Sequence, residues 1–331
     1  MLVRLLSAPG LRRIALRAVV ATLQMPETFV QPNWIHITHI TFTSETDDRY
    51  FLALLRQCPN LVVGKFQVVT SSRDRESEDS SGGSDKPDEE EVLLPRLESL
   101  AIDDFCTSQK MTATLNAIKA PALTRLSYQI FSDVDDPEPD AYFTPLPMPV
   151  LPLLENSTLI RDLSLGGSLS SKDVYKCFQP GAQITRIVFG KPLPANAPPI
   201  KPPLKPSDVV DLRILSGASH PVIPLPRLEF LEAHQLSRLT DEDLLEIITS
   251  RIEAFKRGET VALKSIKISF LRQIQNDISE EVSRLAREGG IEIKLALTYL
   301  TKQGINIKSL TQRLSPSFGL SLAQDVWSHD S

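Results

Sequence analysis

Few residues of the chain have the type and spacing that catalysis or metal binding requires. His36 and His39 form an HxxH pair, but a strand places residues three apart on opposite faces, which makes them poor co-ligands for a metal ion. Cys58, Cys106 and Cys177 lie far apart without CxxC spacing. An odd, sparse set of cysteines is typical of a reducing compartment and of ordinary buried thiols.

Other signatures of catalysis are also missing from the sequence, which contains no GxSxG, Walker loop, GxGxxG or HExxH motif. Three pairs of adjacent aspartates fall at expected strand ends or loops, where Asp commonly accepts hydrogen bonds from free backbone amides. These pairs are Asp47 with Asp48, Asp103 with Asp104, and Asp135 with Asp136. Cys177 is expected in a helix beside Val174 and Phe178, as a packing thiol. We therefore predict a protein that is not an enzyme and holds no metal or cofactor.

The elements that position the remaining side chains come from a repeated apolar pattern. The phrases LPRLESLAI, beginning at Leu94, and LPRLEFLEA, beginning at Leu225, are nearly the same. Both contain apolar-x-x-apolar-x-apolar, which predicts a short strand with one buried face. The pattern starts at Leu11, Ile37, Leu61, Leu97, Leu123, Ile160, Ile184, Val209, Leu228 and Leu263, and a last strand is expected at 291–295. Several separations lie near the repeat length of about 20–29 residues that is typical of leucine-rich repeats.

This recurrence predicts an α/β fold, an irregular leucine-rich-repeat-like solenoid over residues 1–300. Parallel strands would form the concave face, and short helices or arcs the convex face. Return helices are expected at 111–120, 151–156 and 172–178. A longer one should follow the cap Thr240 and stop at Gly258, and another should run from Asp277 to Gly289. Residues 301–331 are expected to form a C-terminal tail, partly packed.

The long gaps between strands are explained by the run 71–91, the loop 133–150 and the helix after Thr240. Residues 71–91 include no large apolar side chain and are predicted to be a disordered acidic insertion. A plain surface insertion is favoured there over a docking or phosphorylation segment. Residues 133–150 form a loop rich in Asp and Pro. Residues 192–206 predict an extended connector, for which a stiff spacer is favoured over an SH3-type ligand.

Charge and hydropathy exclude several partner classes. The chain has 331 residues, a formal net charge of −5 and 41% hydrophobic residues, so neither nucleic acid nor an anionic membrane is an expected partner. No apolar run reaches the length of a membrane span. Residues 1–26 carry arginines and no acid, like a mitochondrial presequence, but Pro9-Gly10 interrupts the helix that such a presequence needs. We therefore expect the cytoplasm or the nucleus.

The strand residues that alternate with the buried ones form the expected binding surface. Their mixed charges and one aromatic side chain suit a protein partner, because Arg and aromatic residues dominate interface energetics. A solvated face without a ligand is the alternative. The candidate partner-binding residues are Arg13, His39, Lys65, Arg125, Asp162, Arg186, Asp211, Arg213, Phe230, Glu232 and Lys267.

The order of the repeat phrases resembles fungal F-box/leucine-rich-repeat proteins of the basidiomycete type. The phrases begin with APGLRRIAL at Ala8, LLRQCPNL at Leu54, LPRLESL at Leu94, APAL at Ala120 and LPRLE at Leu225. The resemblance implies a substrate-recognition repeat domain of an F-box-like ubiquitin ligase subunit. It covers the repeat region only, since no F-box is found before Leu11, so a cullin-type ligase adaptor is an expected partner only if an F-box lies upstream. A free-standing repeat scaffold or inhibitor is the alternative.

Overall fold

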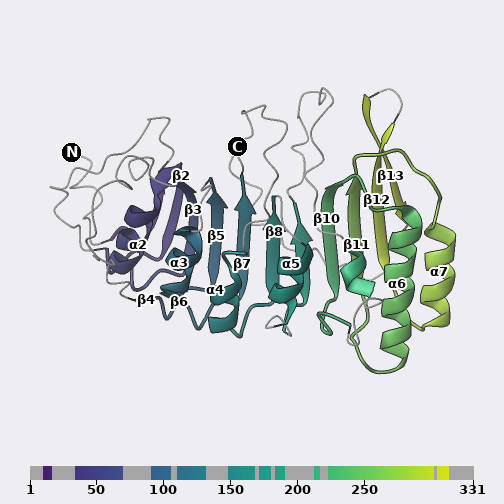
Figure 1. Cartoon of the computed structure of the whole chain (residues 1–331), viewed down its shortest axis with the longest axis horizontal. Coiled ribbons are helices and arrows are strands. Elements are labelled where there is room, and N and C mark those ends of the chain that lie inside the picture. Colours follow the sequence, from purple (N-terminus) through teal and green to yellow (C-terminus); the bar gives the residue numbers. More distant parts are fainter. Residues whose placement is uncertain are drawn as a thin grey trace, which may run out of the picture.

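A single open sheet runs the length of the molecule (Figure 1). The computed structural model describes residues 10–16, 34–69, 91–105, 110–131, 148–167, 171–179, 183–190, 212–216, 223–301 and 304–312. Within them, ten parallel strands follow one another in chain order. β13 is the last strand of the sheet and pairs with β12 in the antiparallel direction. The strands are β1 (Arg13–Leu16), β2 (His39–Asp47), β3 (Val63–Val69), β5 (Ser99–Asp104), β7 (Arg125–Ile130), β8 (Asp162–Gly166), β9 (Arg186–Phe189), β10 (Phe230–Leu236), β11 (Ser265–Phe270), β12 (Lys294–Thr301) and β13 (Gly304–Gln312). The predicted α/β class with parallel strands is confirmed.

The register of the sheet aligns the two apolar positions of the sequence pattern from strand to strand. One row joins Ile14, Ile40, Gly64, Leu100, Leu126, Leu163, Ile187, Leu231, Ile266 and Leu295. Gly64 is the irregular member of this row, and a Cβ there would meet the Phe66 ring at 2.7 Å. That ring packs edge-on against Phe51, with centroids 4.9 Å apart, and fills the missing volume. The buried face is therefore continuous although Gly64 has no side chain.

A tight turn precedes each of six strands. The amide of its fourth residue donates to the carbonyl of its first, as from Leu61 to Cys58 at 3.0 Å and from Leu123 to Ala120 at 3.1 Å. Pro59, Pro95, Pro121 and Pro226 stand second in four of these turns, where the fixed φ of proline suits a turn. The six turns begin at Trp34, Cys58, Leu94, Ala120, Ser157 and Leu225. The frequent prolines of the chain thus have a local structural use.

A second repeated contact follows each turn. The carbonyl of Glu98 accepts from the amides of both Thr124 and Arg125, at 2.9 and 3.0 Å. In the same way, the Arg161 carbonyl accepts from Thr185 and Arg186, and this one-acceptor pattern recurs along the sheet. Consecutive strands therefore begin in the same way.

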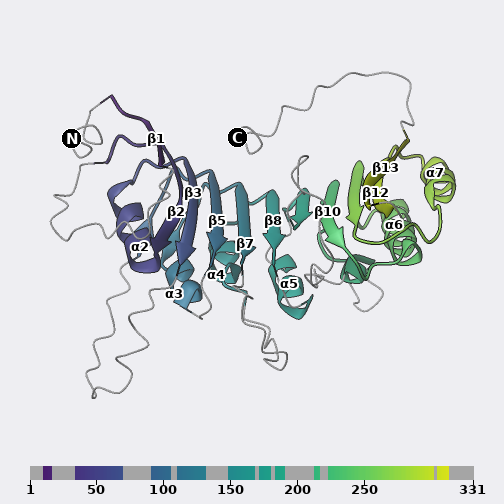
Figure 2. The ribbon, with the colours of Figure 1, turned by 90° about the horizontal axis from the view of Figure 1, so that it is seen from above.

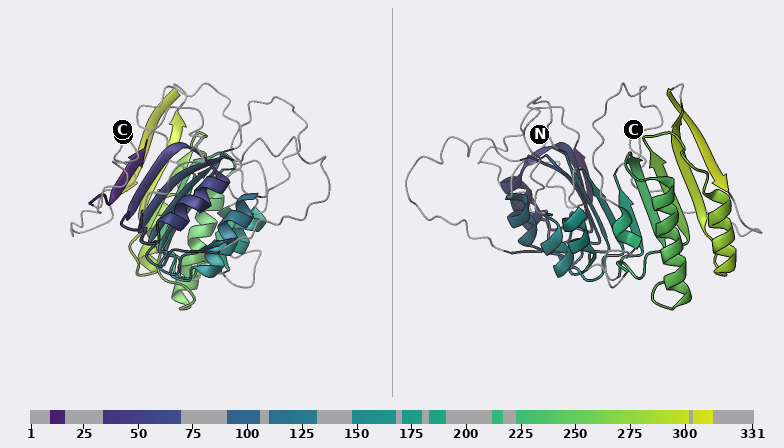
Figure 3. Two further views of the ribbon diagram at one scale, coloured as in Figure 1. Left: turned by 90° about the vertical axis from the view of Figure 1, so that its left-hand side faces the viewer. Right: turned by 45° about the vertical axis from the view of Figure 1, so that its right-hand side comes forward.

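The helices cover one face of the sheet (Figures 2 and 3). They are α2 (Asp48–Gln57), α3 (Lys110–Asn116), α4 (Leu151–Asn156), α5 (Ser171–Phe178), α6 (Asp241–Lys256) and α7 (Ser279–Glu288). Thr240 caps α6 as predicted: its hydroxyl accepts from the Asp243 amide and the Asp243 carboxylate accepts from the Thr240 amide, both at 3.0 Å. The other face of the sheet is the outward face, the side opposite these helices.

Three predicted elements differ in the structure. Val209 lies outside the described residues, and β9 pairs directly with β10, so the strand expected between them is not part of the sheet. Its described part forms the 3-10 helix η2 (Leu212–Ser216) against α6, with Leu212 and Leu215 buried at the three-residue spacing of such a helix. The expected strand 291–295 is found as β12, which starts later at Lys294. The expected helix 111–120 ends at Asn116, before the short strand β6 (Ile118–Lys119), which pairs with β4 (Val92–Leu93).

Helix α2 and strand β13 were not predicted, and β13 carries the sheet beyond residue 300, where the tail was expected to begin. Residues 148–150 of the expected loop 133–150 are buried; 132–147 lie outside the described residues. So do residues 191–211, which include the Pro-rich connector, and nearly all of the acidic insertion 71–91. Residues 1–26 are described only from 10 to 16, a segment that includes β1.

Candidate functional site

Two columns of side chains run along the outward face, as the sequence register predicts. The first contains Arg13, His39, Val63, Ser99, Arg125, Asp162, Arg186, Phe230, Ser265 and Lys294. The second contains Ala15, Thr41, Lys65, Ala101, Ser127, Ser164, Val188, Glu232, Lys267 and Ala296. Nine of the eleven candidate residues thus lie on this face. Arg213 lies instead on η2, which corrects its expected position, and Asp211 lies outside the described residues.

Glu232 is the centre of an ion-pair network on β9, β10 and β11. Its Oε2 accepts from the Arg186 guanidinium at 3.1 Å, and its Oε1 contacts His234 Nε2 at 3.0 Å and Lys267 Nζ at 2.7 Å. Burial by itself raises the pKa of Glu232, but hydrogen bonds from His234 and Lys267 outweigh burial and hold this pKa well below its usual range. The carboxylate is thus charged and fully engaged.

The ring of His234 is buried beside this network, at a bulge of β10. Gln235 has φ 61°, and the pairing of β10 with β11 shifts register between Ala233 and Leu236. Besides Glu232, the ring contacts the Ser269 hydroxyl at 3.5 Å. Sequence reasoning missed His234, although alternation from Phe230 and Glu232 places it on the outward face, because the candidate residues include only the first two outward positions of each strand.

Asp162 on β8 is the second acid of the two outward columns within the described residues. Burial raises the pKa of its carboxyl, while the nearby cations Arg186, Arg125 and Arg161 lower it in part. Arg125 and Arg186 are its register partners on the two neighbouring strands. Asp162 is therefore a partly buried acid with an arginine on each neighbouring strand.

The N-terminal strands carry cations without such partners. Within the described part of the chain, no carboxylate forms an ion pair with Arg13, Lys65 or Arg125. Burial and the charge of Arg13 lower the pKa of His39, which Glu98 partly restores. Of the three cations, Arg125 faces Asp162 and lowers the pKa of its carboxyl in part.

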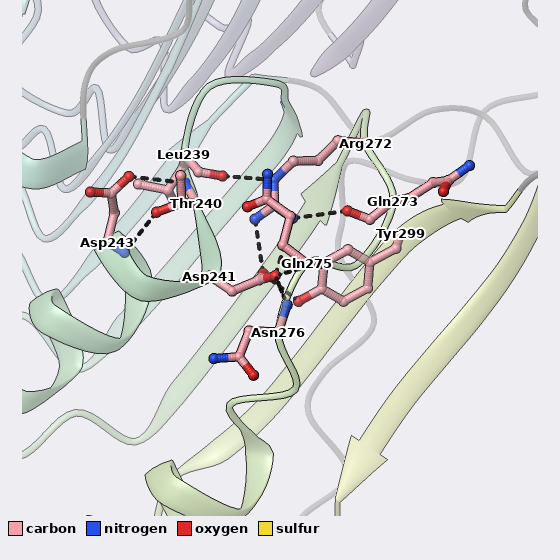
Figure 4. Close-up of polar contacts among 9 residues, drawn as sticks. All are labelled: Leu239, Thr240, Asp241, Asp243, Arg272, Gln273, Gln275, Asn276 and Tyr299. Carbon is pink, nitrogen blue, oxygen red and sulfur yellow. Dashed lines mark hydrogen bonds and ion pairs between the residues drawn. The ribbon is translucent and has the colours of Figure 1, made fainter.

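A second polar centre lies off the outward face, at the start of α6 (Figure 4). The Asp241 carboxylate, whose side chain is 0% exposed, pairs with Arg272 at 2.8 Å and accepts from the Tyr299 hydroxyl at 2.8 Å. It also accepts from the amides of Gln275 and Asn276, both at 2.9 Å. Burial alone raises the pKa of Asp241, but the Arg272 and Asn276 hydrogen bonds reverse the shift and lower it.

These contacts show that the Asp241 centre has a structural role. Arg272 also donates to the Leu239 carbonyl at 2.9 Å and stacks over the Phe270 ring, 4.2 Å from its centroid. Every acceptor site of the carboxylate is directed to the protein itself. The centre therefore joins α6, the segment after β11 and β12, and leaves little capacity for a ligand.

Arg251 of α6 makes another buried polar contact. Its guanidinium donates to the carbonyls of Pro224 at 3.0 Å and Leu225 at 2.9 Å, and burial lowers its pKa to about 10. Leu225 needs this support, since its φ of 54° is rarely adopted by a residue with a side chain. Arg251 thus fixes the turn before β10.

The structure places the histidines and cysteine that were considered for metal binding or catalysis on different elements. His36 lies in the turn before β2 and His39 in β2 itself. Cys177 is buried in α5 as predicted, and burial raises the pKa of its thiol to about 12. Among the described residues, no group of three or more His, Cys, Asp or Glu side chains could hold a metal ion. In the same part of the chain, no helix is long and apolar enough to cross a membrane.

No protein-family model matches this sequence, and no curated protein matches it at a significant level.

Proposed function

We propose that the chain is a leucine-rich-repeat-like solenoid that binds a protein partner on the outward face of its sheet. The observation that carries this proposal is the in-register pair of side-chain columns across β1 to β12. The repeated turns and the in-order parallel strands support a solenoid, in which each unit packs chiefly on its neighbours.

The chemistry of the face favours a protein ligand over a small molecule. Its polar side chains are spread over a long row of strands, and several are arginines, a residue type that is enriched in interface hot spots. A broad surface of this kind matches the extent of a protein or peptide more closely than that of a metabolite, which binds in a pocket that encloses most of its surface.

The resemblance to F-box proteins leads to a narrower proposal, that this repeat domain holds the substrate of a ubiquitin ligase. The alternative is a free-standing scaffold or inhibitor without a ligase. Capture of the cullin-type adaptor with the tagged protein would favour the ligase, and a reproducible set of partners without the adaptor would favour the alternative.

A steric substitution tests the binding face without changing its charge. Ser127→Trp places a large ring in the second column of β7, while Ala113→Trp adds the same ring at an exposed position of α3 on the helix side. Proteins captured by the wild type should be lost with Ser127→Trp and kept with Ala113→Trp. Equal capture by both variants, at equal thermal stability, would contradict the proposal.

A further inference from the structure

From β1 to β11, arginine and lysine side chains on the outward face occur at every second strand, and β12 adds Lys294 beside β11. Following the sheet order, they are Arg13 on β1, Lys65 on β3, Arg125 on β7, Arg186 on β9 and Lys267 on β11. Neighbouring strands lie about 4.8 Å apart, so successive cations are separated by about 10 Å along the sheet.

The strands between these cations differ in the two halves of the face. In the C-terminal half, β8 carries Asp162 between Arg125 and Arg186, and β10 carries Glu232 between Arg186 and Lys267. In the N-terminal half, the intervening strands β2 and β5 carry His39 with Thr41 and Ser99 with Ala101. Within these two columns, neither β2 nor β5 carries a carboxylate, and the nearest outward carboxylate on β5 is Asp103, two residues beyond Ala101.

The position over β5 has a second unusual property. The Ser99 side chain is 0% exposed, and its hydroxyl has no hydrogen-bond partner within the described structure. A buried hydroxyl without a partner lowers the stability of the folded state. Ser99 is the register neighbour of Arg125, so a carboxylate placed over β5 would lie beside the Arg125 guanidinium.

We propose that an acidic segment of a protein partner binds across β1 to β7 and places its carboxylates over β2 and β5, between Arg13, Lys65 and Arg125. This inference rests on the proposed function and names the chemistry of the ligand. The C-terminal half already contains its own anions, and a ligand carboxylate there would have to displace Glu232 from three partners. The N-terminal cations have no such partners to lose.

The separation of β2 and β5 also restricts the conformation of the ligand. A segment in the polyproline II conformation repeats every three residues with a rise of about 3.1 Å per residue, so every third side chain lies on one face, about 9 Å apart. That separation is close to the distance between β2 and β5, which is about 10 Å. The preferred ligand should therefore carry acidic residues at positions i and i+3.

Nucleic acid is less suitable than an acidic protein segment. The protein as a whole has a net charge of −5, which opposes a long polyanion, whereas a short acidic segment interacts mainly with the local cations within a Debye length of about 8–10 Å. Phe230, the aromatic member of the two described columns, is half-buried and lies under Lys264 at 6.0 Å. It thus offers little surface for base stacking.

The test uses the full chain and labelled synthetic peptides in fluorescence anisotropy. One peptide carries Glu at every third position in a Pro- and Ser-rich background, the second carries Gln at the same positions, and the third has the same glutamates clustered together. We expect the first peptide to bind about tenfold more tightly than either of the others, and binding to weaken as salt is raised. A second arm of the experiment uses a variant in which the Asp and Glu residues of 71–91 are replaced by Asn and Gln. The carboxylates of this segment then cannot compete with the peptide for the cations.

Two sets of variants locate the binding. Lys65→Gln with Arg125→Gln should weaken binding about tenfold, while Lys256→Gln with Arg284→Gln, a matched pair on the helix side, should leave it unchanged. Ser99→Asp should also weaken binding because it places a carboxylate of the chain itself on β5, and Ser99→Asn should not. If Ser99→Asp fails to fold, the comparison of the Lys65/Arg125 variant with the Lys256/Arg284 variant locates the binding by itself.

Three outcomes would overturn the inference: equal binding of the acidic and the amide peptide in both arms, unchanged binding by the Lys65/Arg125 variant, or tighter binding of an oligothymidylate. The Ser127→Trp capture experiment separates this failure from failure of the proposed function. Loss of partners with Ser127→Trp but no preference for acid would leave the binding face intact and remove only the acidic ligand.

Discussion

The two halves of the outward face use charge in opposite ways. In the C-terminal half, Arg186 and Lys267 are bound to Glu232, and the carboxylate is engaged on both oxygens. In the N-terminal half, Lys65 and Arg125 have no ion pair within the described residues. The same side-chain types therefore hold a carboxylate in one half and form no ion pair within the described residues of the other. This difference shows that the neighbouring side chains in the sheet, and not the residue type, decide whether an Arg or Lys side chain forms an ion pair.

The Asp241 centre extends this comparison beyond the outward face, since it also lies in the C-terminal half. Asp241→Asn should give the largest loss of stability, about 3–5 kcal/mol, because it leaves the buried Arg272 without its counter-charge. Urea unfolding at neutral pH measures the change. Glu246→Gln, at an exposed position of the same helix, is the control and should have almost no effect. A loss below about 1 kcal/mol for Asp241→Asn would refute the assigned role.

The Glu232 network should give the next largest effect. Glu232→Gln removes the anion that Arg186, His234 and Lys267 share, and we expect a loss of about 1–3 kcal/mol in the free energy of unfolding. Glu229→Gln on the segment just before β10 breaks the single pair with Lys264, at 2.7 Å and more exposed, and should cost less than about 1 kcal/mol. Equal losses for the two variants would argue against a network.

The pH dependence of stability should arise in the C-terminal half. The pKa values of Asp241 and Glu232 are lowered in the folded protein, so the unfolded chain binds protons first as pH falls. Their stabilisation is complete above the ordinary carboxyl range near pH 4 and is lost progressively below it. Unfolding measured between about pH 6 and pH 3 should show a flatter profile for the Asp241→Asn and Glu232→Gln variants than for the wild type. If the variants and the wild type showed parallel pH profiles, Asp241 and Glu232 would be excluded as the source of the pH dependence.

The N-terminal cations should give the smallest effect on stability. Lys65→Gln with Arg125→Gln should change the free energy of unfolding by no more than about 0.5 kcal/mol, because neither side chain has an ion pair to lose. The measurement is the same urea titration. A loss as large as that of Glu232→Gln would mean that the two halves do not differ, and the comparison would fail.

The sequence alone determined the register of most of the sheet. An apolar residue two positions from another fixes which strand face is buried, and a shift by one residue would reverse it. The outward positions of Arg13, Arg125, Asp162 and Glu232 followed directly from that rule. The helices after Thr240 and near Lys172 were also predictable, since their caps and apolar spacing are local properties of the chain.

The tertiary structure decided the contacts that join distant repeats. The pattern near Val209 fits a strand and a 3-10 helix equally well over Leu212–Ser216, and only the direct pairing of β9 with β10 excludes the strand. Asp241 meets Tyr299 across 58 positions of sequence, which no local pattern encodes. The alternation of cations and anions also depends on which strands are neighbours. Local sequence sets the face on which a side chain lies, whereas its electrostatic partner is set by strand order in space.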